Sequence, residues 1–313
     1  MSTFIPVDEA EILSLFLETL IYGARLFIAL WTISVVLIFR RGEDGQAQRR
    51  LLPIGFFMVA GATSHILVDV VRLVQAFVTV PQAGGAIAYY HNVKNPLHIT
   101  KTVLYVSQTL LGDGILIWRC YIVCQKRLRV LFPLVAVWIA TACCGYAISI
   151  SFAVAAPGTT VFSTALNWVT SFGSLTAAIN IICTSAIAYR IWSTGRLSQW
   201  QGSTSLWPIF VVVIETGMLY TAAILAFLIT YLAGSNGQYI ALDMMTQIVG
   251  VSFCLIVLQT QLQVYTRTEQ MSTIRFVNGN TRVVSTGMTE SWTAKATKGT
   301  AQQMQTLVPA GEA

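Results

Sequence analysis

Charged side chains inside apolar segments are the features of this sequence with the clearest chemical meaning. The stretch LLGDGILIWRCYIV places Asp113 and Arg119 six residues apart among Ile, Leu, Trp, Tyr and Val. An ionisable side chain in hydrocarbon costs about 2.5–3.5 kcal/mol on insertion scales, so it usually faces the interior of a helix bundle and meets a polar partner there. We therefore expect a polar network within the apolar part of the chain.

Five residues make up the candidate network: Arg119, Glu215, Asp113, Asp69 and Arg25. With a rise of about 1.5 Å per helical residue, Arg119 and Glu215 would lie at similar depths near one membrane face. They are candidate partners if their helices are neighbours. Asp113 lies about 9 Å further along its helix than Arg119, near mid-membrane. Arg25 would then pair with Asp69 or with Asp113.

Three other charges are expected to reach the membrane surface instead. Glu18 and Asp243 stand close to the ends of their apolar segments, and the long side chain of Arg72 can extend to the interface. The network itself has three readings that the residues leave open. Its pairs can orient the helices, form a switch between two arrangements, or line a path for ions or protons.

The segments that carry these charges have the composition of membrane helices. The chain has 313 residues, of which 55% are hydrophobic and 10% charged, against about 25% charged in soluble domains. Seven apolar segments each approach the roughly 20 residues that cross a bilayer. They span about 15–39, 52–78, 99–123, 130–154, 166–190, 208–233 and 240–263. The sequence predicts an all-α polytopic membrane protein, a seven-transmembrane-helix bundle over 15–264.

Orientation follows from the basic residues between the segments. One set of loops holds most of the Lys and Arg, among them Arg40, Arg49, Lys126 and Arg196, whereas the N-terminal segment 1–14 has none. The positive-inside rule places the N-terminus outside and the C-terminus in the cytoplasm. The tail, 265–313, is rich in Ser, Thr, Gly and Gln, and we expect it to be cytoplasmic and mostly disordered. We expect residence in the plasma membrane rather than in an endomembrane.

Several kinds of chemistry find no support in the sequence. The last apolar segment has no Lys for a retinal Schiff base, and the three histidines, His65, His91 and His98, lack the paired spacing of a zinc helix. No phosphate-binding loop or Ser/His/Asp grouping is present. We expect no enzyme activity, no metal and no cofactor. Because the basic residues sit at the ends of apolar segments, the partner is the lipid bilayer and not nucleic acid.

Three stretches resemble a known family. GDGILIWRCYIV, IETGMLYTAAIL and GSNGQYIALDMMTQIVGVSFCLIVLQ are similar to a large family of seven-span membrane proteins from mushroom-forming (basidiomycete) fungi. The resemblance covers roughly 15–265 and implies a topology and a fungal origin. It implies no activity, because that family is functionally uncharacterised.

A looser resemblance is to G-protein-coupled receptors. Arg119-Cys120-Tyr121 stands where those receptors carry Asp-Arg-Tyr, although Trp118 replaces the acid and Asn-Pro-x-x-Tyr is missing from the last segment. The resemblance implies a receptor-like protein with an unidentified small-molecule ligand, a cytoplasmic G protein as partner, and an Arg119–Glu215 switch. The alternatives are a transporter or channel for small solutes or ions that uses the intramembrane charges, and a structural membrane protein.

Overall fold

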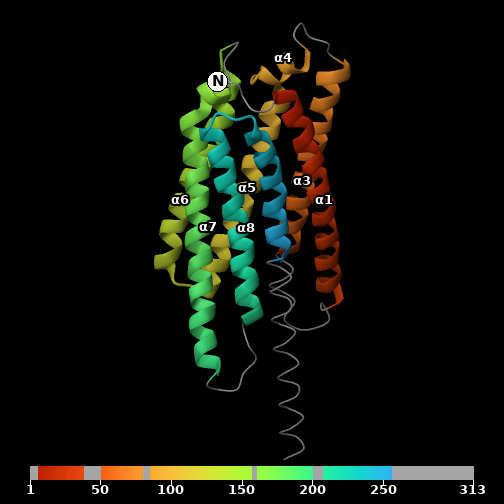
Figure 1. The fold of residues 1–313 in the computed structure, drawn as a ribbon. Helices are drawn as coiled ribbons and strands as arrows, with labels where there is room; N and C mark the ends of the chain where they lie inside the picture. Colours follow the sequence, from red (N-terminus) through yellow and green to blue (C-terminus); the bar gives the residue numbers. More distant parts are fainter. Residues whose placement is uncertain (1–5, 39–50, 80–84, 157–160, 200–206, 256–313) are drawn as a thin grey trace, which may run out of the picture. The chain divides into compact units, whose positions relative to one another are not determined.

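The computed structural model describes residues 6–38, 51–79, 85–156, 161–199 and 207–255, and it contains no strand within these ranges. The long helices are α1 (Val7–Ile38), α3 (Leu51–Val74), α5 (Pro96–Val123), α6 (Leu128–Val154), α7 (Val161–Gln199), α8 (Trp207–Leu232) and a helix over Gly237–Leu255. A π-helical turn, η3 (Gln75–Thr79), extends α3, and the short helix α4 (Gly85–His91) follows. Figure 1 shows the long helices side by side in one bundle.

Six of these helices are long and apolar enough to cross a membrane: α1, α3, α6, α7, α8 and the 237–255 helix. The seventh, α5, has 28 residues and therefore sufficient length. Its composition is more polar because it buries Lys101, Gln108, Thr109 and Asp113. The prediction of an all-α seven-helix membrane bundle is confirmed. This more polar helix, α5, is the one that carries Asp113 and Arg119.

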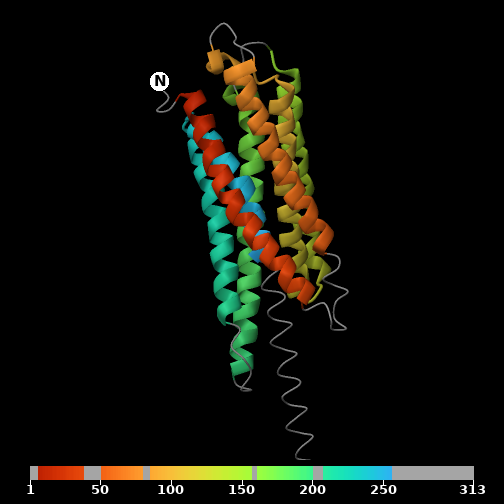
Figure 2. The same ribbon diagram turned by 90° about the vertical axis from the view of Figure 1, so that its right-hand side faces the viewer.

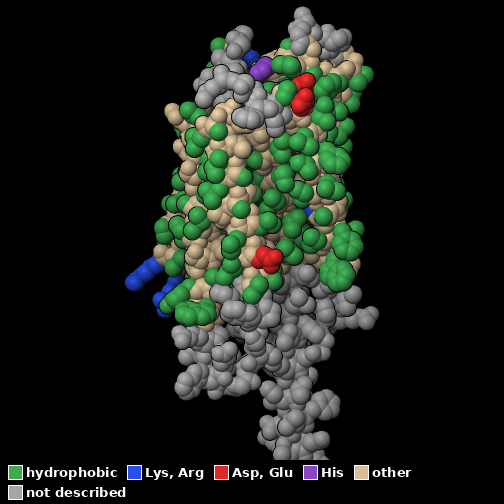
Figure 3. Space-filling view, viewed as in Figure 1, with side chains coloured by type: hydrophobic (Ala, Val, Ile, Leu, Met, Phe, Trp, Pro, Cys, Tyr) green, Lys and Arg blue, Asp and Glu red, His purple; other side chains and the backbone are tan. Residues whose placement is uncertain are grey.

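The distribution of side chains is the reverse of that in a soluble protein. Phe132, Val154 and Ile229 are between 66% and 78% exposed, whereas Glu18 and Asp113 are fully buried. On the face seen in Figure 3, hydrophobic side chains cover much of the helices, and the most prominent Lys and Arg side chains project at the end opposite α4. Lipid tails can surround such a surface at no cost in hydration. The chain is an integral membrane protein.

Helix α5 is the element shared by the two parts of the bundle. It packs against α3 on one side and against α6 and α7 on the other, while α7 also packs against α8 and α1 against α3. Figure 2 shows the same helices from the side. Small residues permit the close contacts: a Cβ on Gly145 of α6 would meet Val106 and Phe172. Side chains of α5 therefore face both groups of helices.

Local sequence fixes two helix ends that matter for the site. The Asn95 side chain accepts a hydrogen bond from the Leu97 backbone N–H at 3.0 Å, and Pro96 opens α5. The second of these ends is that of α8, after which Gly234 (φ +64°) adopts the left-handed conformation that glycine tolerates. The tight turn that follows lets the next helix start at Gly237, beside the same end of α5.

Predicted segments and observed helices agree in number more closely than in their ends. Helix α1 begins at Val7, inside the segment 1–14 that was expected to be extracellular, and α5 begins at Pro96 instead of 99. Contacts divide the chain into two units, 1–259 and 260–313. The predicted tail, 265–313, and the end of the last predicted span, 256–263, lie outside the described residues.

Candidate functional site

Seven ionisable side chains from four helices meet inside the bundle near α4. They are Glu11 and Glu18 of α1, His65, Asp69 and Arg72 of α3, Lys101 of α5, and Asp243 of the 237–255 helix, and we call them the charge cluster. Each is at most 5% exposed. Charges at such depth persist only when they are paired and hydrogen-bonded.

Lys101 is the centre of this cluster. Its Nζ lies 2.9 Å from Oδ1 of Asp69 and 2.9 Å from Oδ1 of Asp243. Arg72 adds a second bridge, with nitrogens 3.2 Å from Glu11 Oε1 and 3.3 Å from Asp69 Oδ1. The four helices are thus joined through shared carboxylates. Removing one member of such a network leaves a buried charge without its partner.

His65 stands between three carboxylates. Its Nδ1 lies 2.9 Å from Glu18 Oε1 and 3.4 Å from Asp69 Oδ2, and its Nε2 lies 4.0 Å from Asp243 Oδ1. A neutral imidazole has one N–H and one lone pair, so one ring nitrogen would turn its lone pair towards a carboxylate. Only Nδ1 is within hydrogen-bond distance of a carboxylate, because the 4.0 Å from Nε2 to Asp243 is too long. The negative charge of the three surrounding carboxylates, and not a second hydrogen bond, is what favours a protonated ring.

The same side chains also have the spacing of a metal site. Glu18, His65, Asp69 and Asp243 each offer one ligand atom, and these atoms lie within 4.8 Å of one another. However, the Lys101 ammonium already contacts Asp69 and Asp243 at 2.9 Å. A protonated His65 beside Lys101 supplies the positive charge that these acids require, so the residues fit a proton better than a metal ion.

Hydrogen bonds extend the cluster towards the middle of the bundle. The Gln247 side chain donates to Glu18 Oε1 at 2.8 Å and accepts from Arg25 at 3.0 Å. Arg25 also donates to the Met58 carbonyl at 2.6 Å, and Gln108 donates to the same carbonyl at 2.9 Å. Arg25 therefore has an amide and a carbonyl as its hydrogen-bond acceptors, instead of the predicted Asp69 or Asp113.

Three further expectations from the sequence were wrong. Glu18 and Asp243, expected at the membrane interface, are fully buried, and Arg72 is 3% exposed instead of reaching the surface. Glu18 is enclosed by His65 and Gln247, and Asp243 by Lys101, whereas Arg72 is covered by α4. The guanidinium of Arg72 lies 5.3 Å from the centre of the Tyr90 ring, in cation–π geometry.

Two central members, His65 and Lys101, were not selected from the sequence. Lys101 stands near the start of the predicted segment 99–123, and in the structure it is buried on the second turn of α5. A signal for His65 was present, since His65 and Asp69 are spaced i, i+4 and Arg72 follows at i+7. That spacing places all three on one face of a helix.

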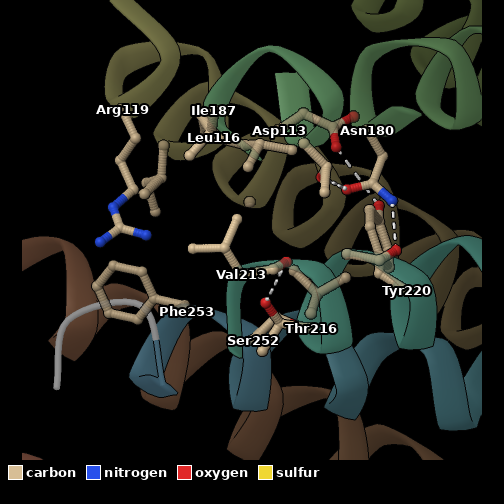
Figure 4. A pocket seen from close by; sticks show the side chains of 15 residues that line it. Asp113, Leu116, Arg119, Asn180, Ile187, Val213, Thr216, Tyr220, Ser252 and Phe253 are labelled. Atoms are coloured by element: carbon tan, nitrogen blue, oxygen red, sulfur yellow. Dashed lines mark hydrogen bonds between the residues drawn. The ribbon is translucent and has the colours of Figure 1, made fainter. Parts of the chain in front are cut away.

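Asp113 and Arg119 line a cavity between α5, α7, α8 and the 237–255 helix, which we call the inner cavity. The Tyr220 hydroxyl donates to Asp113 Oδ1 at 3.5 Å, and Asn180 donates to the Gly217 carbonyl at 3.0 Å. Figure 4 shows Arg119 on the side of this cavity away from Asp113, next to Phe253. Asp113 and Arg119 thus point to different surroundings, as their spacing predicted.

The predicted pair of Arg119 and Glu215 is not formed among the described residues. Glu215 is exposed on α8, while its neighbours Thr216 and Gly217 are buried and line the inner cavity with Arg119. Consecutive helical residues differ by about 100° in direction. Similar depth therefore did not bring the two charges face to face.

A third feature is an aromatic cavity between α5, α6, α7, α8 and the 237–255 helix. Its wall includes Tyr105, Phe172, Phe227 and Gln238, together with Arg72 and Lys101 of the charge cluster. The aromatic cavity and the inner cavity share no lining residue within the described part of the chain. The two cations thus belong both to the cluster and to a cavity wall.

The sequence and the fold were also compared with known proteins. Comparison of the chain with protein-family models, with curated proteins and with solved structures gave no match.

Proposed function

We propose that this integral membrane protein is receptor-like: a small molecule binds in the aromatic cavity and changes how the charge cluster holds the helices together. One observation carries the proposal. Lys101 and Arg72 line the cavity and also bind the carboxylates that join α1, α3, α5 and the 237–255 helix. A ligand in the cavity would touch the groups on which the arrangement of these helices depends.

The separation of the two cavities supports a sensor over a channel. No lining residue is common to the aromatic and the inner cavity among the described residues, whereas one continuous polar path would be expected of a channel. In the proposal the α4 end faces outward across the plasma membrane, and the inner cavity with Arg119 lies nearer the cytoplasm. A cytoplasmic G protein is the proposed partner.

A second candidate is a proton-coupled transporter. This function is favoured by His65, whose ring lies among the buried carboxylates of Glu18, Asp69 and Asp243. Chains of Asp, Glu and His within membrane helices are typical of proton pathways. In this reading the charge cluster would carry protons rather than hold a conformation.

Guanine-nucleotide exchange on fungal Gα subunits tests the receptor proposal. Lys101→Met releases Asp69 and Asp243, so membranes that carry it should stimulate exchange without added ligand, several-fold above native membranes. Lys94→Met is the matched control, because Lys94 is exposed, and it should leave exchange at the native level. Adding Arg119→Ala to Lys101→Met should remove the stimulation.

Proton flux into liposomes separates the two candidates. The receptor proposal expects no flux above that of empty liposomes after a pH jump. Flux that His65→Gln abolishes, together with unchanged exchange in folded Lys101→Met, would contradict it in favour of transport.

A further inference from the structure

The inference concerns Gln238, a buried amide on the first turn of the 237–255 helix. Its side chain lines the aromatic cavity and is 2% exposed, yet neither its Oε1 nor its Nε2 makes a hydrogen bond of good geometry within the described residues, where the neighbouring Tyr239 side chain offers it a weaker polar contact. A buried polar group left unsatisfied costs about 1–3 kcal/mol. Such a group requires an explanation, and a molecule in the cavity provides one.

His98 gives a second, independent indication at the same place. It lines the cavity from the first turn of α5, and both of its ring nitrogens are buried with no hydrogen-bond partner in the part of the chain described. Its ring instead contacts Phe152, with the ring centres 5.1 Å apart. Two polar side chains from different helices thus present unused donors and acceptors to one cavity.

The rest of the wall is aromatic. Tyr105 and Phe172 meet edge to face with ring centres 5.9 Å apart, and Phe227 stacks on Tyr231 at 5.9 Å. Ligand sites are commonly apolar cavities with a few polar groups that fix orientation. The body of the bound molecule should therefore be apolar and flat, with one polar group.

Charge decides between a neutral and an anionic ligand. Arg72 and Lys101 line the cavity, but each already contacts two carboxylates of the charge cluster at 3.3 Å or less. With His65 protonated and Arg25 joined through Gln247, four cations face the four acids Glu11, Glu18, Asp69 and Asp243. An anionic ligand would therefore find no unpaired cation among the described residues of the charge cluster.

Size sets a limit as well. The centre of a water molecule can move through about 60 Å³ of this cavity, which is room for about four to six waters. A molecule built on a single ring suits this space better than a lipid or a peptide.

We propose that the aromatic cavity binds a neutral, single-ring molecule whose one hydroxyl or carbonyl group hydrogen-bonds to the Gln238 side chain, with His98 as the second polar contact. This assignment rests on the proposed function and names the chemical class of its ligand. Arg72 and Lys101 form the part of the wall through which occupancy reaches the charge cluster.

Binding of three probes to the full chain in lipid nanodiscs tests the assignment by ligand-observed NMR. The probes are cinnamyl alcohol, its hydrocarbon analogue propenylbenzene and the anion cinnamate. The native protein should bind the alcohol about tenfold more tightly than the hydrocarbon, a difference in binding free energy of about 1.4 kcal/mol. It should bind cinnamate more weakly than the alcohol. Phe172→Trp, which fills the cavity, should lose all binding. If this variant does not fold, Val169→Phe fills the same cavity and serves as the second test.

Gln238→Leu should bring the affinity for the alcohol down to that for the hydrocarbon. Gln108→Leu is the matched control, since Gln108 is also buried but does not line the cavity, and it should keep the tenfold preference. Equal alcohol binding in native protein and Gln238→Leu would overturn the assignment. Binding that survives Phe172→Trp and Val169→Phe, or tighter binding of cinnamate, would overturn it too.

The two proposals fail separately. If the alcohol shows the expected preference but changes no nucleotide exchange, the ligand class stands and the receptor proposal fails. If no probe binds while Lys101→Met still raises exchange, the ligand class fails and the receptor proposal stands.

Discussion

The Lys101 ammonium lies 2.9 Å from the carboxylate of Asp243, and this ion pair joins α5 to a helix 142 residues further along the chain. The same nitrogen holds Asp69 of α3. Between these helices charge is added to the apolar packing that runs through the whole bundle, because the apolar core also includes Ala29 of α1, Met58 of α3 and Val249 of the 237–255 helix. The two kinds of contact meet at the aromatic cavity.

Replacement of Lys101 by Met should be strongly destabilising. The variant leaves the buried carboxylates of Asp69 and Asp243 without their shared cation, and the loss of one partner of a buried pair costs about 3–5 kcal/mol. Thermal unfolding in detergent measures the effect, with the exposed Lys94→Met as control. Adding Asp243→Asn to Lys101→Met should restore part of the stability. An unchanged midpoint for Lys101→Met would show that the cluster contributes nothing to stability.

Two glycines on neighbouring helices should respond to alanine with opposite signs. A Cβ on Gly250 would overlap the Arg25 guanidinium, so Arg25 would have to leave Gln247 and Met58. Such overpacking costs about 1–3 kcal/mol. A Cβ on Gly23 of α1 would meet nothing within 4 Å. Gly23→Ala should therefore stabilise by about 0.5–1 kcal/mol, because alanine is the better helix former.

Equal melting of the two alanine variants would contradict the placement of Arg25. Differential scanning calorimetry of both proteins in one detergent makes the comparison direct, since the substitution is the same and only its surroundings differ.

Substitutions of Glu215 and Asn180 should differ in their effect on the free energy of unfolding. Glu215 is exposed on α8, so Glu215→Gln breaks no packed contact and should lower the free energy of unfolding by no more than about 0.5 kcal/mol. Asn180 is 2% exposed and donates to the Gly217 carbonyl and to Thr221. Asn180→Leu removes both of these hydrogen bonds and should cost about 1–3 kcal/mol. A large loss for Glu215→Gln would show that this carboxylate has a partner in the membrane.

The number and type of elements could be predicted because segment length and apolar composition are local properties. A run of about 20 apolar residues needs no knowledge of its neighbours to indicate a membrane helix. The burial of Glu18 and Asp243 could not be predicted in this way, because it depends on which helices are adjacent: their partners lie on other helices. The sequence gives no direct measure of adjacency.

The partners of the charges were harder to predict than their depths. Depth along a helix follows from residue number, and it correctly separated Asp113 from Arg119. Direction around the helix axis depends on how each helix is turned in the bundle. Glu215 lies at the depth expected for a partner of Arg119 but points outward. Lys101 lies inside the predicted segment 99–123, but its partners Asp69 and Asp243 lie on other helices whose adjacency the sequence does not show.

The unused amide of Gln238 leads to a prediction about stability without ligand. Gln238→Leu replaces a buried polar side chain that makes no hydrogen bond of good geometry in the described structure with an apolar one of similar size. Such a replacement removes a desolvation penalty, so the empty variant should melt at a higher temperature than the native protein. Residues kept for binding at the expense of stability are expected at functional sites. A lower melting temperature would instead indicate that Gln238 has a structural partner.

His65 leads to the last prediction, which concerns where a proton resides. Because both ring nitrogens face carboxylates, ¹⁵N NMR of histidine-labelled protein at neutral pH should show two protonated nitrogens for the signal that His65→Gln removes. The exposed His91 provides the reference. One protonated and one bare nitrogen at neutral pH would mean that a neighbouring carboxylate carries the proton instead.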